Sequence, residues 1–194
     1  MSGRGLAGAL TLAGIAMVAG IVHILSLLVM PRVAPDDAFA RIVAFAPAGV
    51  VTILPRAAAP TAAGRSGVGD SIPSRDPSVA TAVCRYDLGV GPMRVVAVLG
   101  SEAFLALSLH SRSGVDFYGL NDRAGNDGRL ELVVMTAAQL DAARSRDSED
   151  SPVRDVRVVA PESRGFVTFD VLPRVGGYAE AERDLGSVSC KVEH

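Results

Sequence analysis

Four polar side chains close together in the sequence could carry out general acid–base chemistry. They are Ser108, His110, Asp116 and Tyr118. A histidine beside a carboxylate can take a proton from a water or a hydroxyl, because its pKa lies near neutral pH. The same residues also fit a plainer interpretation, the wet face of an amphipathic sheet. The sequence contains no further catalytic pattern around them, so the plainer interpretation is preferred.

The alternation around these residues predicts a β-hairpin with two candidate registers. A two-residue turn would place Leu109 beside Tyr118, and His110 beside Phe117. A three-residue loop, Arg112-Ser113-Gly114, shifts the pairing by one residue.

The shifted register sets the leucines of the first strand against Val115 and Phe117, and His110 against Asp116. A buried hydrophobic face fixes register, and Gly114 can take the left-handed conformation that a three-residue loop needs. We therefore predict the three-residue loop.

Two cysteines, Cys84 and Cys190, are candidates for a disulfide. In an oxidising compartment one bridge would leave no free thiol and would pin an otherwise loose tail, Gly176 to His194. It would close a loop of roughly 100 residues, worth up to about 4.7 kcal/mol in the chain-entropy model. The alternative is two unrelated small apolar residues, one buried and one on a frayed tail.

Patterns for metals, cofactors and nucleic acids are incomplete. The three histidines are far apart and the cysteines form no C-x-x-C pair. A glycine pattern, Gly3 to Gly8, has no strand before it and so lacks the context of a dinucleotide site. From Pro31 onward, 18 basic against 21 acidic residues leave a net charge of −3 and no basic patch. We predict no metal, no cofactor and no nucleic-acid partner.

Most of the second half of the chain has the pattern of short strands. Runs separated by turn residues lie at Met93–Leu99, Phe104–Arg112, Val115–Leu120, Leu130–Met135, Val153–Val159 and Phe166–Leu172. Six strands at this spacing predict a mainly β domain, an antiparallel sandwich or barrel. We expect two to four short helices in addition, one of them opened by a capping box, Thr136 to Gln139.

The region before these strands is more varied. We expect a short helix at Asp37–Phe45, a strand at Val50–Leu54 and a Pro/Gly/Ser-rich loop from Pro55 to Pro77. Asp76-Pro77 has the form of an N-cap followed by a first-turn proline, which predicts another helix to about Cys84. The expected organisation is thus an anchor at 1–32, a connecting region at 33–77 and a β-rich domain at 78–194.

The N-terminal region predicts a membrane anchor. Leu6 to Met30 contains no Asp, Glu, Lys or Arg, and roughly 20 apolar residues cross a bilayer. The alternative, a cleaved signal peptide, has an apolar region of about 7–15 residues, which is shorter than this one. Flanking charges nearly balance, but a very short N-terminal tail favours a cytoplasmic N-terminus, with the domain in the periplasm.

Several stretches resemble a bacterial family called domain of unknown function 1254. They are Ala82-Val-Cys-Arg-Tyr-Asp-Leu-Gly-Val-Gly-Pro92, Phe104-Leu-Ala-Leu-Ser-Leu-His110, Asp116-Phe-Tyr-Gly-Leu-Asn-Asp122, Arg157-Val-Val-Ala-Pro161 and Arg164-Gly-Phe166. The resemblance covers roughly Val79 to Leu172. It implies a β-rich envelope domain, whose longer members are fused to a domain of unknown function 1214. It assigns no catalytic residues.

Three hypotheses for function follow. The first is a non-catalytic envelope module that assembles with another protein, such as a separate anchored chain carrying domain of unknown function 1214. The second is a hydrolase-like enzyme using His110 with Asp116, Tyr118 or Ser108. The third is a small-ligand binder, which requires a concave pocket with convergent polar groups.

Overall fold

A computed structural model describes residues 3–33, 38–56, 75–98, 104–125, 128–147, 155–173 and 177–193. The chain divides into two compact units, Met1–Asp37 and Ala38–His194. Most of the loop expected from Pro55 to Pro77 lies outside the described residues. The compact unit begins before the expected boundary at residue 78, because helix α2 (Ala38–Val43) and strand β1 (Val51–Ile53) belong to the same unit as the later strands.

The first unit holds one long helix, α1 (Gly3–Val33). Its segment Gly5–Met30 is 26 residues long and apolar enough to cross a membrane, a property that a signal sequence near an N-terminus shares. The large apolar side chains of this helix are exposed.

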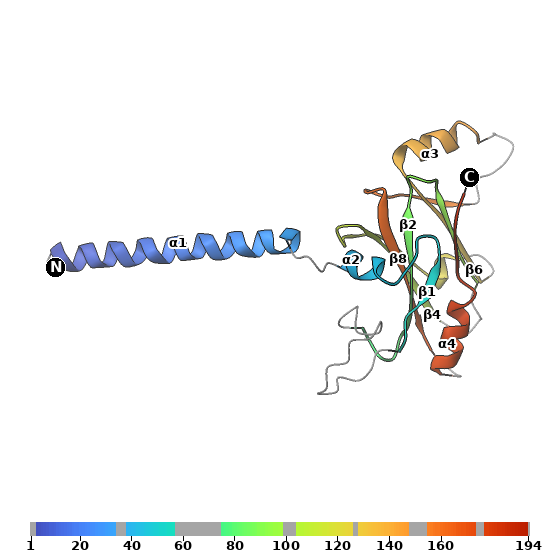
Figure 1. The fold of residues 1–194 in the computed structure, drawn as a ribbon, viewed down its shortest axis with the longest axis horizontal. Helices are drawn as coiled ribbons and strands as arrows, with labels where there is room; N and C mark the ends of the chain where they lie inside the picture. Colours follow the sequence, from blue (N-terminus) through green and yellow to red (C-terminus); the bar gives the residue numbers. More distant parts are fainter. Residues whose placement is uncertain are drawn as a thin grey trace. The chain divides into compact units, whose positions relative to one another are not determined.

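The second unit is a mainly β sandwich of two sheets (Figure 1). Sheet A has the order β1-β2-β8-β4-β5, and sheet B the order β7-β6-β3-β9. The strands are β1 (Val51–Ile53), β2 (Ala80–Asp87), β3 (Met93–Val98), β4 (Phe104–Ser111), β5 (Asp116–Asn121), β6 (Arg129–Met135), β7 (Val156–Val159), β8 (Arg164–Leu172) and β9 (Ser189–Val192). All pairings are antiparallel except that of β6 with β7.

The six strands and the mainly β fold expected from the sequence are confirmed. Helix α3 (Ala137–Arg144) connects β6 to β7, and its capping box is present. The Gln139 side chain also donates to the Leu88 backbone carbonyl at 2.8 Å. This bond ties the start of α3 to the loop that follows β2.

The main hydrophobic core fills the space between the sheets. Alternate residues point inward, such as Leu105, Leu107 and Leu109 of β4 and Val167, Phe169 and Val171 of β8. This follows from the two-residue repeat of a strand, which sends successive side chains to opposite faces.

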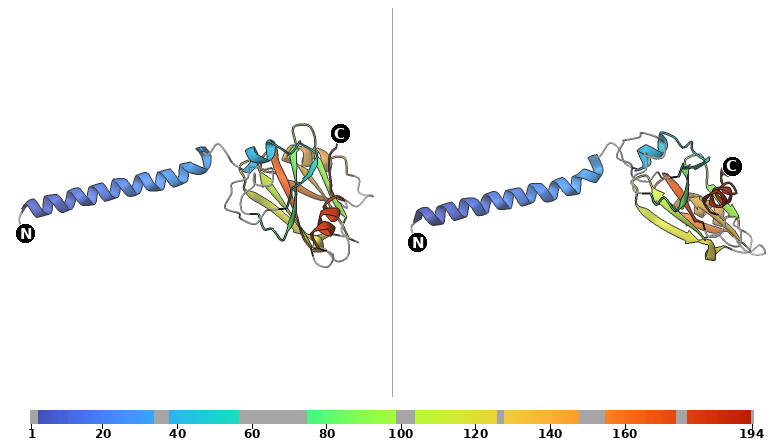
Figure 2. Two further views of the ribbon diagram at one scale, coloured as in Figure 1. Left: turned by 60° about the horizontal axis from the view of Figure 1, so that its bottom comes forward. Right: turned by 90° about the horizontal axis from the view of Figure 1, so that it is seen from below.

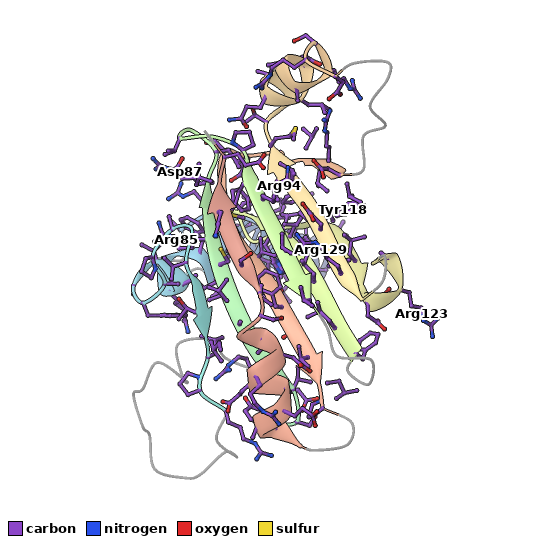
Figure 3. The ribbon with its side chains drawn as sticks, turned by 90° about the vertical axis from the view of Figure 1, so that its right-hand side faces the viewer. Arg85, Asp87, Arg94, Tyr118, Arg123 and Arg129 are labelled. Atoms are coloured by element: carbon purple, nitrogen blue, oxygen red, sulfur yellow. The ribbon has the colours of Figure 1, made fainter. Side chains whose placement is uncertain are left out.

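A second, smaller core lies on the outer face of sheet A. Helix α2 (Ala38–Val43) and the segment after it bury Phe39, Ile42, Ala46 and Leu54 against Val83 and Phe166 of the sheet. Arg85, labelled in Figure 3, donates to the Ala46 carbonyl at 2.9 Å. Sheet A is therefore covered by apolar packing on both faces over part of its area.

The helix expected from Pro77 to Cys84 is wrong, because this segment begins strand β2. Asp76 does cap the chain locally: its carboxylate accepts from the Ser78 backbone N–H at 2.8 Å. The turn leads into a strand, however, and residues 80–84 are all buried. A strand covered on both faces shows no alternation of apolar and polar residues, so the alanine-rich start of β2 resembled a helical sequence.

The expectation of a loose C-terminal tail is also wrong. Helix α4 (Tyr178–Leu185) buries Ala181 and Leu185, and lies beside β2 and β8 (Figure 2). Strand β9 then pairs with β3, with Cys190 opposite Val95. The tail had too few apolar residues to reveal these elements, but four of them, Ala181, Leu185, Val188 and Cys190, are buried.

Candidate functional site

The hairpin of β4 and β5 has the loop predicted from the sequence. Gly114 has a φ of 80°, and its backbone N–H donates to the Ser111 carbonyl at 2.9 Å. His110 pairs with Asp116, as predicted. The expected pairing of the leucines with Val115 and Phe117 is wrong.

A β-bulge changes the register between Leu109 and His110. Leu109 pairs with Tyr118 and Leu107 with Leu120, the pairing of the two-residue alternative, while Phe117 is the extra residue. The bulge lets Phe117 and Leu120 both pack against the core, although they are three residues apart. Each candidate register is therefore correct on one side of the bulge.

The bulge also decides which predicted site residues share a face. Directly paired residues of neighbouring strands project to the same side of a sheet. Tyr118 is paired with Leu109, so its position is on the inward face and not on the face of His110. Ser108 remains on the His110 face, opposite Thr168 of β8.

The His110 ring contacts three side chains from neighbouring strands. Its Nδ1 contacts the Asp116 carboxylate, and its Nε2 lies 3.1 Å from the Thr168 hydroxyl. The ring stacks on Phe166, with centroids 4.5 Å apart and an interplanar angle of 8°. Both ring nitrogens are thus engaged, and Ser108 is not one of their partners.

Burial dominates the electrostatics of His110. Removal from water lowers the pKa of the imidazole below its usual value, and the Asp116 and Asp170 carboxylates oppose that shift. The neutral ring is therefore the favoured form near pH 7. A neutral imidazole has one N–H donor and one acceptor nitrogen, which suits a carboxylate on one side and a hydroxyl on the other.

The polar row continues along β8 into residues that the sequence interpretation missed. The Thr81 hydroxyl of β2 donates to Asp170 at 2.7 Å. Burial raises the pKa of Asp170, with Thr81 and His110 opposing the shift. Thr168 and Asp170 alternate with Val167, Phe169 and Val171, so their shared outer face was available as a signal in the strand predicted there.

In chemical terms, the order Asp116, His110, Thr168 is carboxylate, imidazole and hydroxyl. A hydroxyl activated by an adjacent base is the arrangement of a nucleophilic catalyst. The same contacts also describe a stable hydrogen-bonded cluster beside the smaller core, since Phe166 belongs to both.

A second polar cluster lies on the outer face of sheet B around Arg94. Its guanidinium contacts Glu131 and Glu193 and forms two 3.1 Å bonds with Asp155. Arg129, labelled with Arg94 in Figure 3, donates to Glu131 at 2.9 Å. Hollows of about 330 and 230 Å³ flank Arg94. Two guanidinium groups and three carboxylates meet here, so this face carries charges of both signs.

The two candidate disulfide cysteines are both in the main core. Cys84 of β2 and Cys190 of β9 are 0% and 4% exposed, and both are thiols in this structure. Burial raises the pKa of the Cys190 thiol, and the neighbouring Cys84 thiol adds to that shift. The structure thus brings together two residues more than a hundred positions apart in sequence.

Among the described residues, no group of three or more His, Cys, Asp or Glu side chains is arranged to hold a metal ion. The fold and the clusters define a mainly β sandwich protein with an apolar N-terminal helix. No family model matches the chain, and no curated protein matches it.

One solved structure shares the fold, and a second shows a weaker similarity. The VPA0106 protein from Vibrio parahaemolyticus has a TM-score of 0.52 at 8% identity, over 81% of this chain and 34% of that one. A putative uncharacterized protein from Burkholderia cenocepacia has a TM-score of 0.45 at 13% identity, over 91% of this chain and 49% of that one. The chain thus spans a third to a half of the length of these neighbours.

Proposed function

We propose that the protein is a membrane-anchored envelope protein whose β-sandwich is a non-catalytic assembly or binding module. The observation that carries the proposal is the engagement of His110 within the fold. Asp116 and Thr168 contact the two ring nitrogens, and Phe166 stacks on one face of the ring. These contacts join β4, β5 and β8 beside the smaller core, which supports a structural role for the cluster.

The proposed location is the inner membrane, with a cytoplasmic N-terminus and the sandwich in the periplasm. The support is the 26-residue apolar segment Gly5–Met30, whose large side chains are all exposed. A reporter that is active only in the periplasm, fused after His194, should give signal. Activity from a cytoplasm-only reporter at the same position would reverse the topology.

The proposed partner is a separate anchored chain carrying domain of unknown function 1214. Two points support it: the resemblance to domain of unknown function 1254, and the observation that a sandwich of this fold occupies about a third of a larger chain in the Vibrio neighbour. Split domains often keep the interface they have when fused.

The partner is tested by cross-linking in intact membranes and affinity purification of the full chain. Recovery of a 1214-type chain, and lower levels of this protein when that gene is deleted, are expected. The matched control is the same N-terminal helix carrying an unrelated domain. Unchanged stability and membrane recovery after the deletion would contradict the pairing.

A second candidate function, a hydrolase-like activity, is favoured by the order Asp116, His110 and Thr168. The full chain can be tested with a panel of chromogenic esters. Turnover that is lost in His110→Phe and Thr168→Val, restored in Thr168→Ser and unchanged in Ser108→Ala would establish it. Turnover that does not depend on His110 would leave the cluster with a structural role.

A further inference from the structure

Cys84 and Cys190 face each other across the interior of the sandwich. Cys84 is in sheet A, where it pairs with Val51 of β1 and Val167 of β8. Cys190 is in sheet B, where it pairs with Val95 of β3. Both belong to the same buried core, where they are 0% and 4% exposed, and the Cys84 thiol is close enough to influence the Cys190 thiol. A disulfide between these two cysteines would join the two sheets covalently.

The place of Cys190 in the chain gives such a connection a mechanical role. Strand β9 is the last strand, it lies at the edge of sheet B, and it pairs over only four residues with β3. A bond to β2 would fasten it to an inner strand of sheet A, which pairs with both β1 and β8.

We propose that Cys84 and Cys190 form a structural disulfide that joins the last strand of sheet B to sheet A. The bond in the cell rests on the proposed periplasmic location, since disulfides persist in oxidising compartments. The two thiols give up two protons and two electrons to the disulfide of a thiol–disulfide oxidoreductase. That oxidant is reduced to its dithiol while one S–S bond forms in this protein.

Burial determines when the reaction takes place. The attacking species in disulfide exchange is the thiolate, and burial raises the pKa of the Cys190 thiol. The folded domain therefore holds Cys190 as an unreactive thiol, and burial keeps both cysteines out of reach of an oxidoreductase. The bond must form before β9 docks on β3, and once formed it is protected from reductants by the same burial.

The decisive measurement is a thiol count on the full chain. The protein is extracted from membranes, trapped in acid, denatured and alkylated with iodoacetamide before or after reduction. Mass spectrometry should find no alkylated cysteine before reduction and two after it, in a monomeric chain.

A refolding experiment in solution tests the disulfide independently of the membrane topology. The purified full chain is reduced, denatured and refolded in detergent with a mixture of oxidised and reduced glutathione. An intramolecular bridge formed here supports the proposal whatever the cellular location is. Two free thiols, or bonds between chains, would overturn it. A bridge formed in solution but two thiols in the membrane extract would contradict the periplasmic location instead.

The effect on stability gives an independent readout. Oxidation of the refolded chain should raise the melting temperature by about 5–10 °C, because the bridge closes a long loop in the unfolded chain. The double variant Cys84→Ser/Cys190→Ser should show no response to reductant. Should this variant fail to fold, the thiol count of the unaltered protein still decides.

Discussion

His110 and Phe166 lie directly opposite each other on β4 and β8, with their rings stacked 4.5 Å apart. Phe166 belongs to the smaller core beneath α2, whereas His110 belongs to the polar row with Asp116 and Thr168. The stack therefore joins a hydrophobic cluster to a titratable one, and the ionisation of His110 should affect the stability of the domain.

We expect the free energy of unfolding to fall as the pH drops below about 6.5. The pKa of His110 is lowered in the folded state from its usual 6.5, so in this range the unfolded chain binds more protons than the folded one. The contribution of neutral His110 to the free energy of unfolding is complete above the pKa of the unfolded chain. It decreases as the pH falls toward the lower pKa of the folded state. Urea unfolding between about pH 5 and pH 7 measures the slope.

The variant His110→Phe should reduce this slope, because it keeps a stacking ring and removes the titrating group. The variant Asp116→Asn should have the opposite effect. It removes a charge that raises the pKa of His110, so the folded pKa should fall further and acid destabilisation should increase. An NMR titration of His110 that shows no downward shift from 6.5 would contradict both expectations.

Gly114→Val should destabilise the domain by about 1–3 kcal/mol, the range for a residue forced into a sparsely populated conformation. Gly114 has a φ of 80°, and an added Cβ would meet no atom within 4 Å, so the loss arises from backbone strain alone. Gly119→Ala, in the same hairpin, is the control, since its Cβ would make only an ordinary 3.7 Å contact. An unchanged melting temperature in Gly114→Val would rule out this account.

Gly165→Ala should be more damaging than Gly114→Val, for a steric reason. A Cβ at this position would lie 2.2 Å from the His110 carbonyl oxygen and from the Tyr86 hydroxyl, which are joined by a 3.0 Å hydrogen bond. Overpacking typically costs about 1–3 kcal/mol and sometimes more. Tyr86→Phe, which removes only the bond, should lose about 0.5–1.5 kcal/mol. Equal losses of stability in Gly165→Ala and Tyr86→Phe would show that the sheet relaxes around the added methyl group.

Arg94→Gln should cost about 1–3 kcal/mol near pH 7, since the guanidinium makes charge-assisted bonds to three carboxylates. The pKa of Glu131 is lowered first by Arg129 and then by Arg94, so the stabilisation is present above the unfolded pKa and is lost as the pH falls. The difference from the unaltered protein should therefore fade below about pH 4. Arg129→Gln removes a single, more exposed partner of Glu131 and should cost less. A difference that persists at low pH would point to lost packing instead of lost charge.

The sequence predicted the parts of the fold in which one face of a strand is buried and the other is wet. Strands β4 and β8 alternate clearly, and both were expected. Strand β2 lies between β1 and β8, with the smaller core on one face and the main core on the other, so its alternation disappears. Strand β9 has four residues, too few for any periodicity.

The candidate site was predicted in part for the same reasons. The pairing of His110 with Asp116 follows from loop length and was found. The position of Tyr118 on the opposite face from His110 depends on the β-bulge, and no residue type in the sequence indicates a bulge at Phe117. Thr168 and Asp170 could have been included, because their strand was predicted with its correct faces. Their contacts with His110 and Thr81 depend on strand order, which adjacency in sequence does not provide.

The smaller core on the outer face of sheet A also determines where the β-sandwich can be separated from the N-terminal helix. Phe39, Ile42, Ala46 and Leu54 precede residue 78, yet they cover Val83 and Phe166 of the sheet. A shortened chain that starts at residue 78 would leave this apolar area wet and would also lose the edge strand β1. Such a chain should aggregate, whereas one that begins at Ala38 keeps its covering and should behave as a soluble protein.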